Sequence, residues 1–148
     1  MICRARFFLA VVLTCVLTSS ALAERSVILV TSENCAMDSI SMLDVRKAYF
    51  GISVSYEGQH VRAFRLNNDE ELNRVFFQTV VAMSERSYER RLLSMLLKYG
   101  TPRPAEVQSV AVLADELGHS NCGIGYMWGD DIEPGNGLKN IRLLWQGD

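Results

Sequence analysis

Arg65 and the acidic residues that follow it form the most chemically suggestive stretch of the chain. The run RLNNDEELNRVFF, residues 65–77, places an arginine at the end of an apolar segment and three consecutive acids at the start of a predicted helix. A helix N-terminus offers unpaired backbone amides and a positive dipole end, and both favour an anion. Arg65 together with those amides could therefore bind a phosphate-like group.

The same acids have a simpler explanation as helix caps. Asn68 is a suitable N-cap residue, and Glu71 three positions later completes an N-x-x-E capping box. Acids in the first turn also complement the helix dipole by about 0.3–1 kcal/mol each. Capping leaves Arg65 unexplained, and we expect it to pair with Asp69 or Glu70 rather than with a ligand.

Two cysteines outside the N-terminal segment offer a second kind of chemistry. Cys35 and Cys122 are an even pair, which in an exported chain predicts one disulfide first and two free thiols second. A metal site ranks third, because His60 and His119 are isolated in the sequence from both cysteines and from each other. The acids of the loop 129–140 are interpreted as a solvated turn rather than a cation site.

Familiar catalytic motifs are absent from the sequence. It contains no G-x-S-x-G, no H-E-x-x-H and no G-x-x-x-x-G-K-[ST] run. The glycines of GIGYMWG open no helix, so they do not make a dinucleotide fingerprint. We therefore expect no cofactor, and we expect that the protein is not an enzyme.

The N-terminus has the composition of a secretory signal peptide. Arg4 and Arg6 precede a short apolar run, and SSALA follows it, which predicts a signal segment at residues 1–23 with cleavage after Ala23. The domain then covers 24–148 and is periplasmic, with no stable membrane anchor after cleavage. Loss of the two arginines takes the net charge from −2 to −4. This acidic balance argues against nucleic acid as a partner.

Apolar patterns place these residues on alternating strands and helices. Strands are predicted at 26–30, 61–66, 123–128 and 141–145, and 52–60 is predicted to be a loop with a Glu-Gly turn. Helices are predicted at 42–50, with Ser41 as its cap, and at 69–82. This alternation predicts an α/β fold, a three-layer sandwich with a mixed, mostly parallel sheet.

Two further helices are predicted after these. One follows Ser84 and ends at Gly100, with a single buried stripe formed by Tyr88, Leu92, Met95, Leu96 and Tyr99. TPRP is a rigid linker, and Pro104 suits the first position of the next helix. The stripe predicted for that last helix consists of Val107, Val110, Ala111, Ala114 and Leu117.

The order of these pieces resembles a known family. ILVTSEN, VRKAYFGISVSYEGQHVRAFRL, the passage at 76–109 and CGIGYM are similar, in that order, to segments of small bacterial phosphate ABC transporter substrate-binding-like proteins. These belong to the type 2 periplasmic-binding-protein class, and the resemblance covers about residues 27–128. It implies one lobe of that fold, whereas complete members close two lobes on a ligand.

The resemblance also implies where a ligand would lie. Phosphate binders of the class read R-x-x-G-S-G-T at the strand-to-helix turn, where this chain keeps Arg65 but has Asp69, Glu70 and Glu71 at the last three positions. At about 4 Å and an effective dielectric near 20, one carboxylate repels an anion by on the order of 4 kcal/mol. The ligand-binding residues implied for a solute are Ser32, Asn34, Arg65, Asn67 and Asn68.

Two functions follow from this interpretation. The first is an exported accessory or sensory domain whose phosphate site is degenerate, with a membrane sensor or transporter component as its partner. The alternative is a solute-binding protein for phosphate or another small anion in ABC-type uptake. We expect phosphate to bind with a dissociation constant no tighter than about 1 mM.

Overall fold

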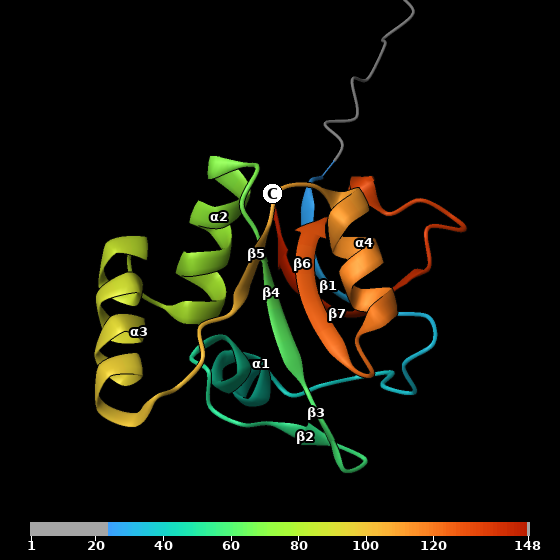
Figure 1. Ribbon diagram of the computed structural model, residues 1–148. Coiled ribbons are helices and arrows are strands. Elements are labelled where there is room, and N and C mark those ends of the chain that lie inside the picture. Colours follow the sequence, from blue (N-terminus) through green and yellow to red (C-terminus); the bar gives the residue numbers. More distant parts are fainter. Residues whose placement is uncertain (1–23, 148) are drawn as a thin grey trace, which may run out of the picture.

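One five-stranded sheet organises the chain (Figure 1). The computed structural model describes residues 24–147, and its strands lie in the order β5–β4–β6–β1–β7. Their bounds are β1 Ser26–Ser32, β4 Arg62–Leu66, β5 Ala105–Val107, β6 Gly123–Trp128 and β7 Leu138–Gln146. The signal segment predicted at residues 1–23 lies outside the described residues.

Four of these strands point the same way, and β1 opposes them. β4 pairs in parallel with β5 and with β6, whereas β1 pairs antiparallel with β6 and β7. The prediction of a mixed, mostly parallel sheet is therefore confirmed. Because β1 runs antiparallel to the other strands, its carboxyl end lies at the opposite end of the sheet from the carboxyl end of β4.

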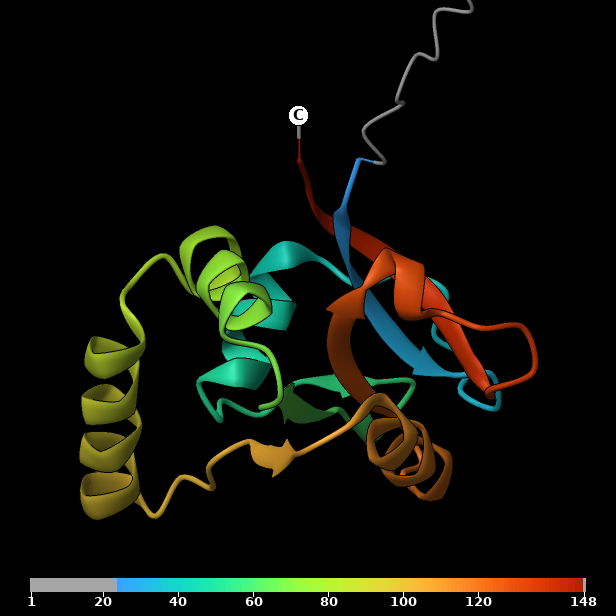
Figure 2. The ribbon, with the colours of Figure 1, turned by 90° about the horizontal axis from the view of Figure 1, so that it is seen from above.

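Helices cover both faces of the sheet. α1 (Met42–Tyr49) and α2 (Glu70–Phe76) lie on one face, and α4 (Val110–His119) lies on the other (Figures 1 and 2). α3 (Glu85–Tyr99) stands at the periphery, outside the layer formed by α1 and α2 (Figure 2). The three layers match the predicted sandwich. None of the helices in residues 24–147 is long and apolar enough to cross a membrane.

Two glycines of β6 allow α4 to pack closely on the sheet. A Cβ on Gly125 would lie 2.6 Å from a methyl of Leu113, and one on Gly123 would lie 2.7 Å from a methyl of Leu117. Both leucines are fully buried. The G-x-G spacing of this strand is thus explained by close packing between helix and strand rather than by a phosphate.

Side-chain caps fix the starts of several helices as the sequence predicts. The Ser41 hydroxyl accepts a hydrogen bond from the backbone amide of Asp44 at the start of α1. Ser84 caps α3 in the same way, and Gly100 ends it with a positive φ of 65°. These local signals need no tertiary contact, which is why the sequence shows them.

The segment predicted to be a loop at 52–60 is instead a small hairpin. β2 (Ser55–Tyr56) pairs antiparallel with β3 (Gln59–His60). The turn residues Glu57 and Gly58 have φ angles of 48° and 79°, as a two-residue hairpin turn of the primed type requires. The predicted Glu-Gly turn is confirmed, but its flanking residues are short strands.

The sequence predicts that the last helix begins at Pro104, which is too early. Pro104 precedes a short strand, β5, which pairs in parallel with β4. Helix α4 begins only after its N-cap residue, Ser109. This also changes the buried stripe: Leu113 and Leu117 are buried, whereas Ala111 is exposed. An edge strand of three residues carries too little periodicity to be recognised in the sequence.

The predicted helix at 69–82 is present but changes type. α2 ends at Phe76, and the chain continues as a π-helical turn, η1 (Phe77–Val81), which closes at Ala82 with a φ of 59°. The stripe predicted for α3 is only half correct. Tyr88 and Leu92 are buried, whereas Leu96 and Tyr99 are exposed.

Candidate functional site

Arg65 lies near the carboxyl end of β4 and is buried. Only 2% of the residue is exposed, and its guanidinium lies 5.1 Å from the ring centre of Phe77 and 5.3 Å from that of Tyr88. These rings come from η1 and from α3. The sequence predicts this position for Arg65, at a strand end beside a helix start, but it does not predict the burial.

Three carboxylates hold the guanidinium of Arg65. Nη1 donates to Glu89 Oε1 at 2.5 Å and to Glu106 Oε1 at 3.1 Å, and Nη2 donates to Glu85 Oε1 at 3.0 Å. Both terminal nitrogens are therefore engaged, while the buried Nε meets no acceptor in the described part of the chain. We call these four residues the Arg65 cluster.

The elements around β4 deliver these acids. Glu106 is the direct cross-strand neighbour of Arg65 on β5, and Glu85 and Glu89 lie one turn apart on α3. Glu89 also pairs with Arg103, and Glu106 accepts a hydrogen bond from the amide of Asn67 at 3.2 Å. Two of the three acids therefore have a second partner besides Arg65, and the third, Glu85, is positioned by helix α3.

Burial and charge act in opposite directions on the pKa of Arg65. Desolvation lowers the pKa, whereas Tyr126 when ionised, the hydrogen bond to Glu89 and the charge of Glu106 raise it, so the pKa lies above its ordinary value. The guanidinium is charged at every pH at which the protein is folded. The cluster therefore contains a permanent cation that is already neutralised by acids.

The expectation that Arg65 forms ion pairs is confirmed, but the expected partners are wrong. Asp69, not Asn68, is the N-cap of α2: its Oδ1 accepts from the Leu72 amide at 3.0 Å, and its Oδ2 accepts from Trp128 Nε1 at 2.7 Å. Glu71 pairs instead with Arg25 at 3.3 Å. The ion pairs of Arg65 include neither Asp69 nor Glu71, because the helix cap and the indole hold the carboxylate of Asp69 and Arg25 holds that of Glu71.

The two hydrogen bonds also set the charge state of Asp69. The bond from Trp128 and then that from the Leu72 amide hold the pKa of this carboxyl below its usual range. Asp69 is therefore ionised under most conditions and fully used in the fold. It is a structural cap at the position where the phosphate binders described above carry a serine.

The five residues proposed for a ligand do not lie together. Arg65, Asn67 and Asn68 are at the carboxyl end of β4, and Asn67 joins the Arg65 cluster through Glu106. Ser32 is the last residue of β1 and Asn34 follows it, and because β1 runs in the opposite direction to β4 they lie at the opposite end of the strands. Asn68 faces a separate cavity of about 510 Å³ between α4 and the acidic loop.

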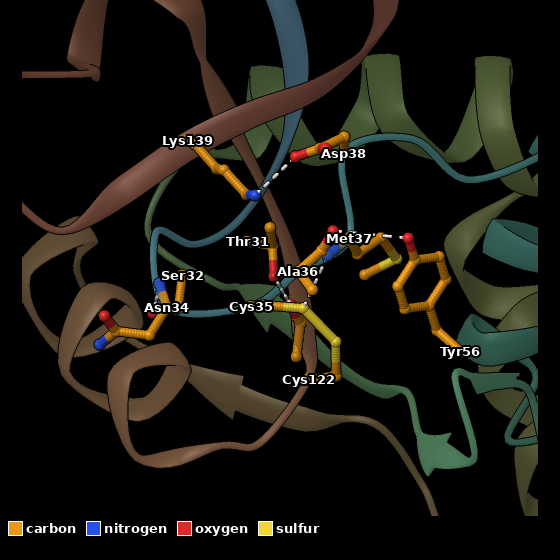
Figure 3. The surroundings of a disulfide bond; sticks show 11 residues. Thr31, Ser32, Asn34, Cys35, Ala36, Met37, Asp38, Tyr56, Cys122 and Lys139 are labelled. Atoms are coloured by element: carbon orange, nitrogen blue, oxygen red, sulfur yellow. Dashed lines mark hydrogen bonds and ion pairs between the residues drawn. A yellow bond between two sulfur atoms is a disulfide. The ribbon is translucent and has the colours of Figure 1, made fainter.

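The disulfide lies at the same end of the strands as Ser32 and Asn34 (Figure 3). Cys35 and Cys122 are bonded, with Cα atoms 5.5 Å apart, and both are buried. The predicted disulfide is thus confirmed. Beside it, the Ser32 hydroxyl accepts a hydrogen bond from the backbone N–H of Asn34 at 3.2 Å.

A polar cavity of about 340 Å³ opens next to this disulfide. Its lining includes Asn34, Tyr56 and His119, and a neighbouring cavity of about 480 Å³ is lined by both His60 and His119. The histidines are isolated in the sequence, but the hairpin and α4 bring them to one surface. Within residues 24–147 no group of three or more metal-ligating side chains is formed.

Sequence reasoning missed Glu85, Glu89 and Glu106 as partners of Arg65. A signal existed for two of them, since Glu85 and Glu89 share the helical face of Tyr88, which the sequence predicts to be buried. Acids on a buried face require a cation. Glu106 gave no such signal, because β5 was not recognised as a strand.

Comparison with known proteins adds one likeness. No family model and no curated protein sequence matches the chain. Among solved structures, an ABC-type phosphate transport receptor from Vibrio cholerae is similar, with a TM-score of 0.57 and 11% sequence identity. The likeness is one of fold. It covers 80% of this chain and 46% of the receptor, so this chain spans about half of the receptor's length.

Proposed function

We propose that this chain is an exported, non-catalytic domain with one lobe of a type 2 periplasmic-binding-protein fold, and that it acts as an accessory or sensory partner of a membrane sensor or transporter component. Its anion site is degenerate. The observation that carries this proposal is the Arg65 cluster, in which Glu85, Glu89 and Glu106 engage both terminal nitrogens of the one buried arginine at the strand end.

Charge explains why this arrangement disfavours phosphate. An incoming anion would have to displace carboxylates from Arg65 and then remain beside them. At about 4 Å and an effective dielectric near 20, each such repulsion is on the order of 4 kcal/mol, a factor of roughly a thousand in affinity. The likeness to 46% of a phosphate receptor supports one lobe, and one lobe alone does not exclude water from an anion.

Calorimetry with inorganic phosphate tests the proposal. The unaltered protein should bind with a dissociation constant no tighter than about 1 mM. A variant with Glu85→Gln, Glu89→Gln and Glu106→Gln keeps hydrogen-bonding groups around Arg65 but removes the competing charge, so it should bind phosphate at least about tenfold more tightly. Micromolar binding by the unaltered protein would overturn the degenerate-site interpretation.

A charge-matched control separates local from general electrostatics. Glu70→Gln, Glu71→Gln and Glu133→Gln also remove three exposed carboxylates, two of them in the first turn of α2. None of these three acids pairs with Arg65, and salt screens exposed charges. At physiological salt the phosphate affinity should therefore stay within about twofold of that of the unaltered protein. Circular dichroism confirms folding, and the double variant Glu85→Gln with Glu106→Gln replaces the triple variant if folding fails.

The alternative function, solute binding for uptake, has one observation in its favour. Asn34, one of the proposed ligand residues, lines the cavity of about 340 Å³ beside the disulfide, far along the sheet from the Arg65 cluster. A thermal-shift screen against phosphate, sulfate, other oxyanions and small metabolites distinguishes the two functions. A stabilising solute whose effect is abolished by Asn34→Ala and kept in the triple glutamine variant would favour uptake.

Export is part of the proposal and has its own test. Cleavage after Ala23 should give a mature protein that begins at Glu24 in the periplasmic fraction. Mass spectrometry of that fraction measures the N-terminus directly. A chain that keeps Met1, or one that carries lipid on Cys15, would contradict it.

A further inference from the structure

α3 exposes more apolar side chains than a surface helix needs. Leu93, Leu96, Leu97 and Tyr99 are 49%, 39%, 76% and 76% exposed, and they lie within seven consecutive positions. Figure 2 shows the helix at the margin of the molecule, set apart from the sheet. Gathered apolar side chains of this kind usually mark a surface that contacts something else.

One face of α3 combines two of these leucines, Leu93 and Leu97, with arginines. Arg86, Arg90, Leu93 and Leu97 recur at i, i+4, i+7 and i+11, which places them on a single stripe, and all four are exposed. At about 100° per residue this stripe lies roughly half a turn from Tyr88, the residue that anchors α3 to the body. We call it the α3 outer face.

The α3 outer face is basic on an acidic protein. The two acids of the helix, Glu85 and Glu89, pair with Arg65 and not with the arginines of the outer face. Among the described residues, the ion pairs include neither of the arginines of the outer face, and neither Arg91 nor Lys98. The chain as a whole has a net charge of −2, so the positive charge is local to this helix.

The size and charge of the α3 outer face indicate what kind of partner it contacts. A stable interface with a second protein needs about 20–30 residues a side, far more than the side chains gathered here. A bilayer surface needs only a few leucines at the depth of the acyl boundary and basic side chains that reach the headgroup phosphates. Anionic lipids add attraction for each arginine or lysine near the surface.

We propose that the α3 outer face docks reversibly on anionic membranes, with Leu93 and Leu97 entering the interface and Arg86 and Arg90 contacting lipid phosphates. Glu85 and Glu89 connect α3 to β4 through their ion pairs with Arg65, and the outer face remains exposed. This inference does not depend on whether the Arg65 cluster binds an anion.

Vesicle cosedimentation tests the docking. Protein recovered from the periplasmic fraction, with its N-terminus established by mass spectrometry, is mixed with vesicles of phosphatidylcholine alone or of phosphatidylcholine with phosphatidylglycerol. Binding should require phosphatidylglycerol and should weaken as salt is added. The variant Leu93→Glu with Leu97→Glu, and the variant Arg86→Glu with Arg90→Glu, should each bind at least about tenfold more weakly.

A matched control comes from the far side of the sheet. Leu143 on β7 is 52% exposed, close to the value for Leu93, and Leu143→Glu should leave vesicle binding unchanged. All variants share the same N-terminus, so a retained signal segment would raise binding equally and would not mimic the result. Circular dichroism verifies that each variant is folded.

Three outcomes would overturn this inference. The first is no binding to phosphatidylglycerol vesicles at low salt, and the second is equal binding by the leucine variant and the unaltered protein. The third is a dimer in light scattering that the leucine variant converts to a monomer, since the α3 outer face would then contact a second copy of the chain.

Discussion

The two ends of the strands differ in what holds them together and in what their polar residues contact. At the carboxyl end of β4, the buried cation of Arg65 forms ion pairs with three carboxylates of the fold. At the carboxyl end of β1, a covalent bond between Cys35 and Cys122 secures the loops, and polar side chains remain exposed around open cavities. At the first end, acids of the fold engage both terminal nitrogens of Arg65, whereas at the second a covalent bond holds the loops and polar side chains line cavities.

Removal of the buried cation should have the largest effect on stability. Arg65→Ala removes a side chain that is 2% exposed together with its three ion pairs, and truncation of a large buried side chain to alanine typically lowers the free energy of unfolding by about 2–5 kcal/mol. The three carboxylates left behind are 33–55% exposed, so their mutual repulsion adds only a little to this loss. Urea denaturation at neutral pH measures this change.

A compensated variant shows whether charge is the reason. Arg65→Met combined with glutamine at the three glutamate positions removes the cation and the anions together, and it should recover most of the lost stability. If Arg65→Ala lowers the free energy of unfolding by less than about 1 kcal/mol, the Arg65 cluster does not stabilise the fold. The two ends of the strands would then not differ in the way described.

Loss of the disulfide should have the next largest effect. The bond joins positions separated by 87 residues, and the loss of a native disulfide typically lowers the free energy of unfolding by about 2–5 kcal/mol. The variant Cys35→Ala with Cys122→Ala should show this loss in urea. The unaltered protein measured with and without a reducing agent is the matched control, and the double variant should not respond to that agent.

The cap of α2 should have a smaller effect. Asp69→Ala removes the acceptor for the Leu72 amide and for the indole of Trp128, and substitution of an N-cap by alanine usually lowers stability by about 0.5–2 kcal/mol. Asn68→Ala is the comparison, since the structure gives Asn68 no capping role. Thermal unfolding of both variants should rank Asp69→Ala clearly below Asn68→Ala, and the reverse order would restore the cap predicted from the sequence.

The pH dependence of the same cap is the smallest expected effect. The pKa of Asp69 in the folded protein lies below its ordinary value because Trp128 and the Leu72 amide stabilise the carboxylate. Its contribution is therefore present above the unfolded pKa and is lost as pH falls through the folded pKa. The stability difference between the unaltered protein and Asp69→Asn should shrink between about pH 5 and pH 2. A difference that stays constant over this range would rule out the carboxylate as its source.

Much of the fold could be predicted from the sequence because its signals are local. Ser41, Ser84 and Gly100 mark helix ends through hydrogen bonds and backbone angles that involve only nearby residues. Apolar runs identify β1, β6 and β7, and the two cysteines outside the N-terminal segment leave one pairing. Short edge strands such as β5 carry no such signal, so the placement of Pro104 at a helix start was wrong.

The sequence by itself determined that Arg65 stands at a strand end beside a capped helix and that Cys35 and Cys122 are the available pair. Only the tertiary structure decided which acids reach Arg65, because Glu85, Glu89 and Glu106 come from elements 20 to 41 residues away. It also decided that β1 runs in reverse and separates Ser32 and Asn34 from Arg65. Strand direction and long-range ion pairs depend on the packing of whole elements against one another, and a linear pattern of residues does not record that packing.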